Sequence, residues 1–500
     1  MDETKLLDES FAELSSIKTE AEREAEAAEE SIYVDDTVKK EYEKYYRTDN
    51  PISELHLIKY TNAIEATDPI KYNGRVKNVR GLIIEGRGPE AFVGEVCRLR
   101  IKPGRDVLAE VVGFERDSIK LMTIGEMEGI APGCLITGTG KGLAIPVGEC
   151  LLGRVLDGIG RPIDNKGSLG AEKWTSILSD VPDALTRRRV TEPLSVGVRA
   201  IDGLLTVGRG QRLGIFSGSG VGKSTLLSMM ARGTSADVNV LALVGERGKE
   251  VRDFIERDLQ EEGLARSVLV IATAEQEPLV RIRAAFVATT IAEYFRDQGK
   301  DVLLLMDSLT RFAQAQRQIG LSIGEPPTMR GFTPSVFSLI PKLVERAGTN
   351  DKGSITAFYT VLVEGDDVIN DPVADSARGH LDGHIALSRD LAMKNHYPAI
   401  DIPSSISRVM TDIVSDKQMQ NASNLREMIK VWRDAEDLIN IGAYARGSSP
   451  KIDMAVQMQE GINQYLKQGI FEPSTIEDAE KKLAALFTKS VIKAAPLRKR

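Results

Sequence analysis

The residues best suited to chemistry lie in the stretch 213–227, where an apolar run leads into a glycine-rich loop and then into a helix-forming segment. The glycines of this loop allow consecutive backbone N–H groups to turn inward, and the helix that follows directs its positive dipole end to the same place. Lys223 adds a positive charge, and Ser224 offers a hydroxyl to a magnesium ion. The pattern predicts a phosphate-binding loop for a nucleotide, made by Gly218, Ser219, Gly220, Val221, Gly222, Lys223, Ser224 and Thr225.

One position of the loop departs from the strict motif, which has glycine five residues before Gly222, where this chain has Ser217. Serine is small and fits if its φ angle is negative, so the prediction of a phosphate-binding loop stands. The alternative interpretation, a simple connector between a strand and a helix, leaves Lys223 without a purpose. A similar stretch at 138–142, Gly-Thr-Gly-Lys-Gly, is followed by neither Ser/Thr nor a helical pattern, and we interpret it as an ordinary loop.

A carboxylate suited to the same site follows the apolar run 303–306. Ligands of parallel sheets collect at the carboxyl ends of the strands, so Asp307 is expected beside the loop. There it can bind magnesium, acting through Ser224 or a bound water. The alternative is that Asp307 only caps the helical segment that starts near Leu309.

A second candidate carboxylate, Glu246, follows the apolar run 238–244. A carboxylate at this edge of the sheet can orient and polarise an attacking water. Glu250 and Glu275 compete for the role, and the spacing of the residues alone does not choose among the three.

These side chains need a parallel sheet to bring them together. Four apolar runs of strand length, at 238–244, 267–273, 302–307 and 355–363, are separated by helical stretches such as 278–298. Continuous apolar strands that alternate with helices indicate an α/β fold with a parallel sheet covered on both faces.

The chain of 500 residues is too long for one hydrophobic core, and its texture changes along its length. Residues 1–65 are expected to form an acidic arm, partly helical or disordered. Residues 66–147 are rich in short β-runs and predict a small β-barrel. Residues 148–410 are expected to form the nucleotide-binding core, and residues 411–500 a helical C-terminal domain.

The charge of the chain is uneven. Its net charge is −8, and residues 1–50 hold sixteen Asp and Glu against seven Lys and Arg, so the remainder is close to neutral. A near-neutral body has no general attraction to nucleic acid, and the barrel region has only Tyr72, Phe92 and Phe114 for stacking on bases. We therefore expect no nucleic-acid partner.

The compartment is also constrained by the sequence. The longest purely apolar runs have about five residues, against roughly twenty needed to span a bilayer, so any membrane contact is expected to be peripheral. Three widely spaced cysteines without metal-ligand spacing, and no secretory signal, favour a reducing, cytoplasmic setting.

Several motifs together resemble the ATPase of type III protein export, a family related to the catalytic subunit of rotary ATP synthases. The motifs are the loop 218–227, Gly-Glu-Arg-Gly-Lys-Glu-Val at 245–251, Asp-Ser-Leu-Thr-Arg-Phe-Ala-Gln-Ala at 307–315, Gly-Phe-Thr-Pro-Ser-Val-Phe at 331–337, Leu-Asp-Gly-His-Ile at 381–385 and His-Tyr-Pro-Ala-Ile-Asp at 396–401. The resemblance implies an N-terminal β-barrel, a RecA-like P-loop ATPase core and a C-terminal helical domain. It also implies a homo-hexameric ring with ATP and Mg²⁺ bound between subunits.

The resemblance assigns roles to the residues of the core. Glu246 matches the carboxylate that activates water, and Lys223 and Ser224 match the residues that hold phosphate and magnesium. Asp307 matches the acid at the end of the second strand. Arg408 matches the arginine that a subunit supplies to its neighbour's site.

Two further residues are placed near the nucleotide by resemblance. Tyr397 matches the position that stacks on adenine, with core packing as the alternative. Arg311 lies in the matching segment after the second-strand acid, with a surface ion pair as the alternative.

The expected function is Mg-ATP hydrolysis for type III protein export at the base of a flagellum, on the cytoplasmic face of the inner membrane. The implied partners are a regulatory stalk protein, a central stalk, export chaperones, unfolded export substrates and a membrane export gate. The flagellar choice rests on the segments 374–378 and 400–408. The alternatives are an injectisome (virulence) secretion ATPase, a rotary ATP synthase subunit, a non-catalytic nucleotide-binding ring subunit and a ring helicase.

Overall fold

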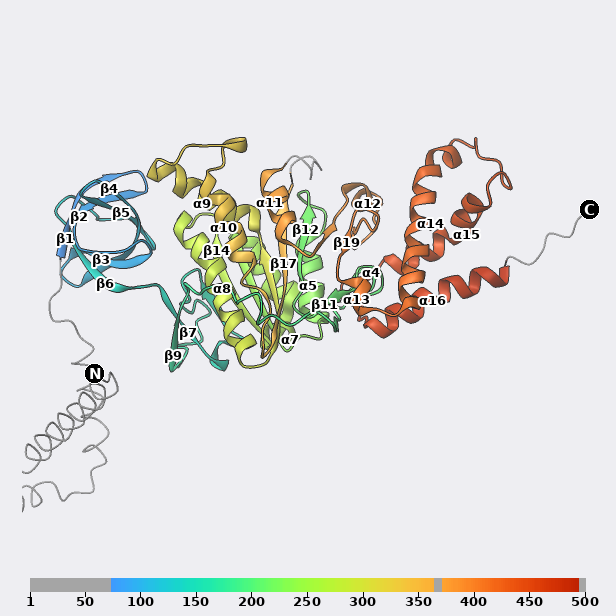
Figure 1. Cartoon of the computed structure of the whole chain (residues 1–500), viewed down its shortest axis with the longest axis horizontal. Coiled ribbons are helices and arrows are strands. Elements are labelled where there is room, and N and C mark those ends of the chain that lie inside the picture. The colour runs from blue at the N-terminus through green and yellow to red at the C-terminus, as the bar shows by residue number, and fades with distance from the viewer. Residues whose placement is uncertain (1–72, 364–370, 494–500) are drawn as a thin grey trace, which may run out of the picture. The chain divides into compact units, whose positions relative to one another are not determined.

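The computed structural model describes residues 73–363 and 371–493 of the chain. The expected acidic arm at residues 1–65 lies outside these residues, as do the first residues of the expected barrel and the C-terminal residues 494–500. Within the described residues, the chain forms a β-barrel, a central α/β unit and a group of C-terminal helices (Figure 1).

The first strands close into a barrel in the order β1-β2-β5-β4-β3-β6. The side chains of each strand alternate between the inside and the outside, and the inward-facing ones form a small apolar core that includes Ile84, Leu99 and Leu121. The predicted barrel is therefore confirmed. Its strands are β1 (Asn73–Arg80), β2 (Ile83–Arg87), β3 (Glu95–Lys102), β4 (Arg105–Glu115), β5 (Ser118–Thr123) and β6 (Leu135–Gly142).

The stretch 138–142, which we interpreted as an ordinary loop, belongs to strand β6. This interpretation was wrong because the strand is held by neighbours that are distant in sequence. Cys97 pairs with Gly138, and Arg98 pairs with Thr137, both across the antiparallel β3–β6 ladder.

Short elements connect the barrel to the central sheet. They are β7 (Ala144–Val147), which pairs with β9 (Lys173–Ser176), the 3₁₀ turn η1 (Glu149–Leu151), β8 (Val155–Asp157), β10 (Pro193–Leu194), α4 (Arg199–Leu204) and β11 (Val207–Gly208). Strand β8 was not predicted, and it joins the edge of the central sheet beside β14 (Ser267–Thr273). An ion pair also joins the barrel to the core: Arg283 Nε of helix α8 (Pro278–Asp297) donates to Glu110 Oε2 of β4 at 2.7 Å.

The central sheet confirms the predicted α/β architecture. Its strands follow the order β19-β18-β12-β17-β15-β13-β14-β8, and the pairs from β18 to β8 are all parallel. The strands are β12 (Arg212–Ser217), β13 (Val238–Glu246), β14 (Ser267–Thr273), β15 (Asp301–Asp307), β16 (Gly348–Thr349), β17 (Ser354–Leu362), β18 (Gly383–Ala386) and β19 (Ile406–Ser407).

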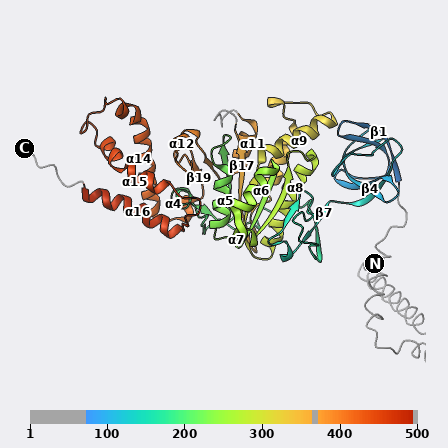
Figure 2. The same cartoon turned by 180° about the vertical axis from the view of Figure 1, so that it is seen from behind.

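Helices cover both faces of this sheet, which explains why its strands are apolar without alternation. One face packs Val240, Ala242 and Leu304 against α8, α9 and α10, and the other packs Leu241, Leu243 and Leu305 against α5 and α7. Figures 1 and 2 show helices on both faces of the sheet. The helices and turns of the core are α5 (Lys223–Gly233), α6 (Gly248–Asp253), the π-helical turn η2 (Phe254–Leu259), α7 (Gln260–Ala265), α8 (Pro278–Asp297), α9 (Leu309–Ile323), η3 (Met329–Gly331), α10 (Pro334–Val344), α11 (Pro372–His380), α12 (Arg389–Met393) and α13 (Met410–Ile413).

The described residues after the core form three helices, α14 (Asp416–Asn440), α15 (Pro450–Leu466) and α16 (Ile476–Lys493). They confirm the prediction of a C-terminal helical domain. The apolar side chains of these helices pack in the same hydrophobic core as those of α4. Gln468, which follows α15, contacts the start of α4 and the residues before it. Its amide accepts a hydrogen bond from the Arg199 N–H at 2.8 Å and donates one to the Gly197 carbonyl at 2.9 Å.

Candidate functional site

The predicted phosphate-binding loop runs from the end of β12 to the first turn of α5. Gly220 and Gly222 have φ angles of 79° and 94°, which favour glycine because a side chain strains the backbone there. No N–H group of residues 218–222 donates a hydrogen bond within the described part of the chain. These donors, together with the N-terminal end of α5, are therefore available to an anion.

Three of the predicted side chains meet at the carboxyl end of the sheet. Lys223 Nζ lies 2.5 Å from Asp307 Oδ1 and 3.4 Å from Glu246 Oε1. All three side chains are at least 85% buried, with 11%, 4% and 15% exposure for Lys223, Asp307 and Glu246. They meet because β13 and β15 are neighbouring parallel strands that end at the same edge.

Burial dominates the electrostatics of this group. It raises the pKa of the Asp307 carboxyl, and nearby Glu246 adds to the effect while the Lys223 ammonium opposes it. Burial also raises the pKa of Glu246, and the neighbouring Glu250 carboxyl adds to the effect while Lys223 opposes it. For Lys223 burial alone would lower the pKa, but the two carboxylates outweigh burial and raise it.

This charge balance suits a divalent cation. Two carboxylates face one ammonium group, and a negative surplus in a buried site favours a hard cation with oxygen ligands. The Ser224 hydroxyl, in the first turn of α5, adds the type of oxygen that Mg²⁺ binds in phosphate-binding loops. The residues present therefore fit Mg²⁺ together with a nucleotide phosphate.

The structure separates the competing carboxylates. Of Glu246, Glu250 and Glu275, only Glu246 pairs with Lys223 within the described residues. Glu250 lies on α6 with its side chain 52% exposed, 4.0 Å from Arg247. Glu275 is exposed in the turn before α8. Glu246 is thus the carboxylate best placed to act on a water beside the loop.

The alternative role for Asp307, capping the next helix, belongs to another residue. Ser308 is the N-cap of α9, and its Oγ accepts a hydrogen bond from the Arg311 N–H at 3.2 Å. The Asp307 side chain is consequently not used as a helix cap and points into the site beside Lys223.

Sequence reasoning missed one member of the group, Thr360. Its Oγ1 donates a hydrogen bond to Asp307 Oδ1 at 2.7 Å, and the residue is fully buried on β17. Its strand reads as a continuous apolar run, so Thr360 carried no signal except that it is polar.

Arg311 lies beside the site without reaching Lys223. Gly245 has a φ angle of 75°, and a Cβ atom added to it would come within 2.7 Å of the Arg311 Cβ. The stem of Arg311 therefore packs against the residue before Glu246. Its Nη1 donates to Gln314 Oε1 at 3.0 Å, a hydrogen bond rather than the surface ion pair of the alternative reading.

Tyr397 stands next to the loop. A Cβ atom added to Gly222 would lie 3.5 Å from the Tyr397 ring. Tyr397 itself is 42% exposed, so it is not packed in the core. Its carbonyl accepts a hydrogen bond from the Gln468 N–H at 3.1 Å, so the chain after α15 holds this residue in place.

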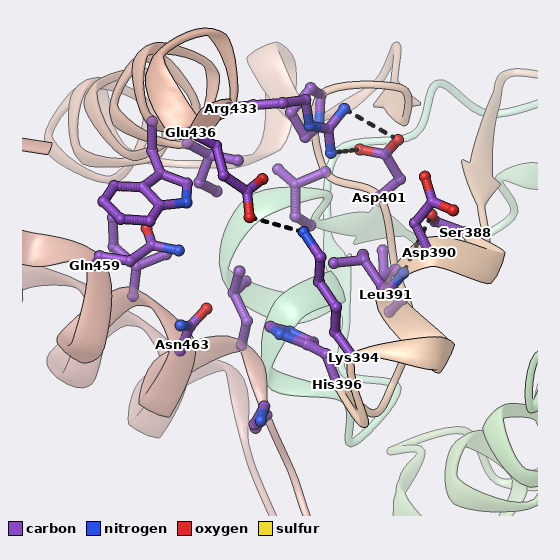
Figure 3. Close-up of a pocket in the computed structure, with 18 residues that line it drawn as sticks. Ser388, Asp390, Leu391, Lys394, His396, Asp401, Arg433, Glu436, Gln459 and Asn463 are labelled. Atoms are coloured by element: carbon purple, nitrogen blue, oxygen red, sulfur yellow. Dashed lines mark hydrogen bonds and ion pairs between the residues drawn. The ribbon is translucent and has the colours of Figure 1, made fainter. Parts of the chain in front are cut away.

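The segment that carries Tyr397 also faces a cavity of about 440 Å³ between the core and helices α14 and α15 (Figure 3). Lys394 donates to Glu436 at 2.8 Å and Arg433 donates to Asp401 at 2.8 Å, and all four residues line this cavity. Figure 3 shows both ion pairs reaching from the core segment to α14. The position of Tyr397 is therefore linked to that of the C-terminal helices.

Arg408 is exposed just after β19, and its backbone N–H donates to the Asp382 carbonyl at 3.0 Å. Its side chain makes no hydrogen bond or ion pair with the described residues, the Lys223 group included. The structure thus leaves this arginine available to another molecule.

In the described part of the chain, no helix combines the length and the apolar character that a membrane span requires.

Three family models match the chain. The ATP synthase alpha/beta family beta-barrel domain matches residues 76–140, and the nucleotide-binding domain of the same family matches residues 197–407. The T3SS EscN ATPase C-terminal domain matches residues 414–485.

Individual relatives cover most of the chain. A flagellum-specific ATP synthase of Bacillus subtilis is 51% identical over 427 residues, which are 85% of this chain and 97% of the relative. A type 3 secretion system ATPase of Xanthomonas euvesicatoria is 51% identical over 406 residues, which are 81% of this chain and 92% of the relative. Among solved structures, the assembled ATPase EscN of the enteropathogenic E. coli type III secretion system is 47% identical, with a TM-score of 0.79 over 83% of this chain and 99% of that one.

Proposed function

This chain belongs to the family of flagellum-specific ATP synthases and type 3 secretion system ATPases, and we propose that it hydrolyses Mg-ATP to drive protein export at the base of a flagellum. The observation that carries the proposal is the convergence of Lys223, Glu246 and Asp307 beside a loop with free N–H donors.

Each residue has a defined part in the reaction. The loop N–H groups and Lys223 bind the β- and γ-phosphates, so Lys223 exchanges its carboxylate partners for phosphate oxygens. Ser224 and Asp307 would hold Mg²⁺, which would neutralise charge on the phosphates. Glu246 then accepts a hydrogen bond from a water in line with the γ-phosphate and orients it for attack. Phosphate binding thereby frees Glu246 from Lys223 at the moment when its basicity is needed.

The remaining predicted residues complete the nucleotide site. Tyr397 provides an aromatic face for the adenine ring, and Arg311 supports the backbone that carries Glu246. Arg408 acts on the site of a neighbouring copy, where it stabilises the charge of the transition state. The lack of any partner for its side chain among the described residues supports this role.

The active form is a homo-hexameric ring. The solved relative EscN is described as an assembled ATPase, and a second structure, 46% identical with a TM-score of 0.77, shows EscN with its central stalk EscO. By similarity, this chain pairs with a central stalk and a regulatory stalk protein, and it delivers chaperone-bound, unfolded substrates to a membrane export gate. It does so from the cytoplasmic face of the inner membrane, by peripheral association.

An injectisome secretion ATPase is the second candidate function, because the Xanthomonas relative is as identical to this chain as the Bacillus one. Deleting the gene in the organism that encodes this chain separates the two. Loss of flagellar filaments with secretion of virulence proteins intact supports the flagellar assignment, and the opposite result assigns the chain to an injectisome.

The enzymatic proposal is tested by ATP turnover per subunit over a wide range of protein concentration. A ring completed by identical neighbours requires turnover to rise steeply with concentration and then to reach a plateau. Low turnover at all concentrations would contradict a self-sufficient enzyme and would favour a rotary-type or non-catalytic ring subunit.

The role of Glu246 is tested by Glu246→Gln. This variant is expected to lose about 10²–10⁴ of the turnover, since a positioned base contributes that much, and to bind a non-hydrolysable ATP analogue as the wild type does. Glu275→Gln is the matched control and should keep normal turnover, because Glu275 is exposed and outside the Lys223 group. Normal turnover of Glu246→Gln would show that another group activates the water.

A further inference from the structure

The Asp307 carboxylate is held by a second donor besides Lys223. Lys223 Nζ at 2.5 Å and Thr360 Oγ1 at 2.7 Å both contact the same oxygen, Oδ1. No hydrogen bond from the described residues reaches Oδ2. One oxygen of the carboxylate is therefore occupied twice, while the other remains available.

Sheet topology places Thr360 where it can do this. Strand β17 lies between β12, which leads into the phosphate-binding loop, and β15, which ends at Asp307. In this register Ile215 pairs with Thr360, and Met306 pairs with Tyr359. The Thr360 hydroxyl therefore comes from a rigid strand at the centre of the sheet, and the residue is fully buried.

The two donors differ in what happens when nucleotide binds. Lys223 is the first residue of α5, directly after the phosphate-binding loop, and in the proposed reaction its long, flexible side chain turns to the phosphates. Thr360 has no such movement available, because β-branched residues in a central strand are restricted at χ1 and its backbone is in the ladder. After Lys223 leaves, the hydroxyl of Thr360 is the remaining contact on Asp307 Oδ1.

We propose that Thr360 is a positioning residue that keeps Asp307 Oδ2 directed toward Mg²⁺ once Lys223 has turned to the phosphates. This role rests on the proposed function. It adds to that function a residue on strand β17, outside the phosphate-binding loop and Asp307, that positions a metal ligand. Without the hydroxyl, the Asp307 carboxylate rotates about its terminal torsion, which is intrinsically broad, and loses affinity for the metal.

The test uses Thr360→Val, which removes the hydroxyl and keeps the branched shape. The measurement is the binding of a fluorescent ADP analogue to the full chain as Mg²⁺ is titrated. The affinity for the ADP analogue without Mg²⁺ should stay as in the wild type. The Mg²⁺ concentration that gives half of the gain in this affinity should rise about tenfold, because a hydrogen bond to a charged group is lost. Thr360→Ser, which retains the donor, should restore the wild-type titration.

The matched control is Thr356→Val on the same strand. Thr356 is 1% exposed, and its Oγ1 accepts a hydrogen bond from the Gly210 N–H at 2.8 Å, away from the Lys223 group. It should lower thermal stability without changing the Mg²⁺ titration. If Thr360→Val fails to fold, Thr360→Ala makes the same deletion with a smaller side chain and should give the same tenfold shift.

Two results would overturn the proposal in distinguishable ways. A wild type that gains affinity with Mg²⁺ while Thr360→Val titrates identically would refute the role of Thr360 alone. A wild type whose affinity for the ADP analogue does not respond to Mg²⁺ at all would refute the proposed function and this role with it.

Discussion

The loop at 218–225 and the stretch at 138–142 contain similar residues and behave in opposite ways. Both combine glycines with a lysine, and in both the residue before the lysine, Gly222 or Gly140, is a glycine with a positive φ angle. In the barrel, the Gly140 N–H donates to Glu95 Oε1 at 2.8 Å, and Thr139 Oγ1 donates to the Lys141 carbonyl at 3.1 Å. In the core, the N–H groups of residues 218–222 have no acceptor among the described residues.

The difference teaches that glycine and lysine do not make a phosphate site by themselves. The barrel stretch satisfies its own donors with a buried carboxylate, as stable backbone generally does. The core loop leaves its donors open because a helix starts there, and it turns its lysine toward two carboxylates from neighbouring strands. The flanking elements, rather than the loop composition, create the binding site.

The largest expected effect comes from removing each lysine in turn. Lys223→Ala should abolish ATP turnover and tight nucleotide binding, because the charge beside the phosphates is lost and two buried carboxylates remain without a partner. Lys141→Ala should leave both unchanged, since Lys141 is exposed on the barrel. Equal losses in a nucleotide-binding assay would contradict the distinction between the two stretches.

A second prediction tests whether a neighbouring copy completes the core site. Arg408→Ala should lower turnover about 10³- to 10⁵-fold while leaving nucleotide affinity of the loop intact. Mixing it with Glu246→Gln should restore activity, because some sites then combine an intact Glu246 with an intact arginine from the neighbour. Random one-to-one mixing gives about a quarter of the wild-type turnover. No recovery on mixing would indicate that Arg408 does not act between copies.

The third prediction uses a carboxylate that occupies backbone donors, as Glu95 does in the barrel. Asp202 accepts hydrogen bonds from the N–H groups of Val196 at 2.9 Å and Gly197 at 3.2 Å, and from Ser195 Oγ at 2.8 Å. Burial nevertheless raises the pKa of Asp202 to about 7, against these hydrogen bonds. The protonated form is therefore favoured in the folded state more than in the unfolded state.

The sign of the pH dependence follows directly. The stabilisation is fully present below pH 4, near the unfolded pKa, and it is lost as the pH rises toward 7. Over that window the wild type should lose up to about 4 kcal/mol relative to Asp202→Asn, which cannot ionise. Urea unfolding of both proteins at a series of pH values measures the difference. A constant difference between pH 4 and pH 8 would show that Asp202 stays ionised in the folded state.

The smallest effect is expected from the two glycines. Gly222→Ala and Gly140→Ala should each cost about 1 kcal/mol of stability, because both positions have positive φ. Only Gly222→Ala should also weaken nucleotide binding, since the added methyl group would face the Tyr397 ring beside the loop. Calorimetry of nucleotide binding on the two folded variants separates the effects.

Much of the fold followed from local patterns. The apolar runs predicted β13, β14, β15 and β17 closely, because strands that are buried on both faces consist almost entirely of apolar residues. Strand β8 was missed because three residues carry no period of their own.

The sequence by itself predicted which residues could carry the chemistry of the site. The loop, Lys223, Ser224, Asp307 and Glu246 are each marked by a motif or by the end of an apolar run, and such signals are local in the chain. Only the tertiary structure decided that Glu246 rather than Glu250 faces Lys223, that Ser308 rather than Asp307 caps α9, and that Thr360 holds Asp307. Thr360 and Asp307 are 53 residues apart, and they meet because β17 is inserted between β12 and β15. Strand order is set by the packing of the whole sheet, which residue spacing does not encode.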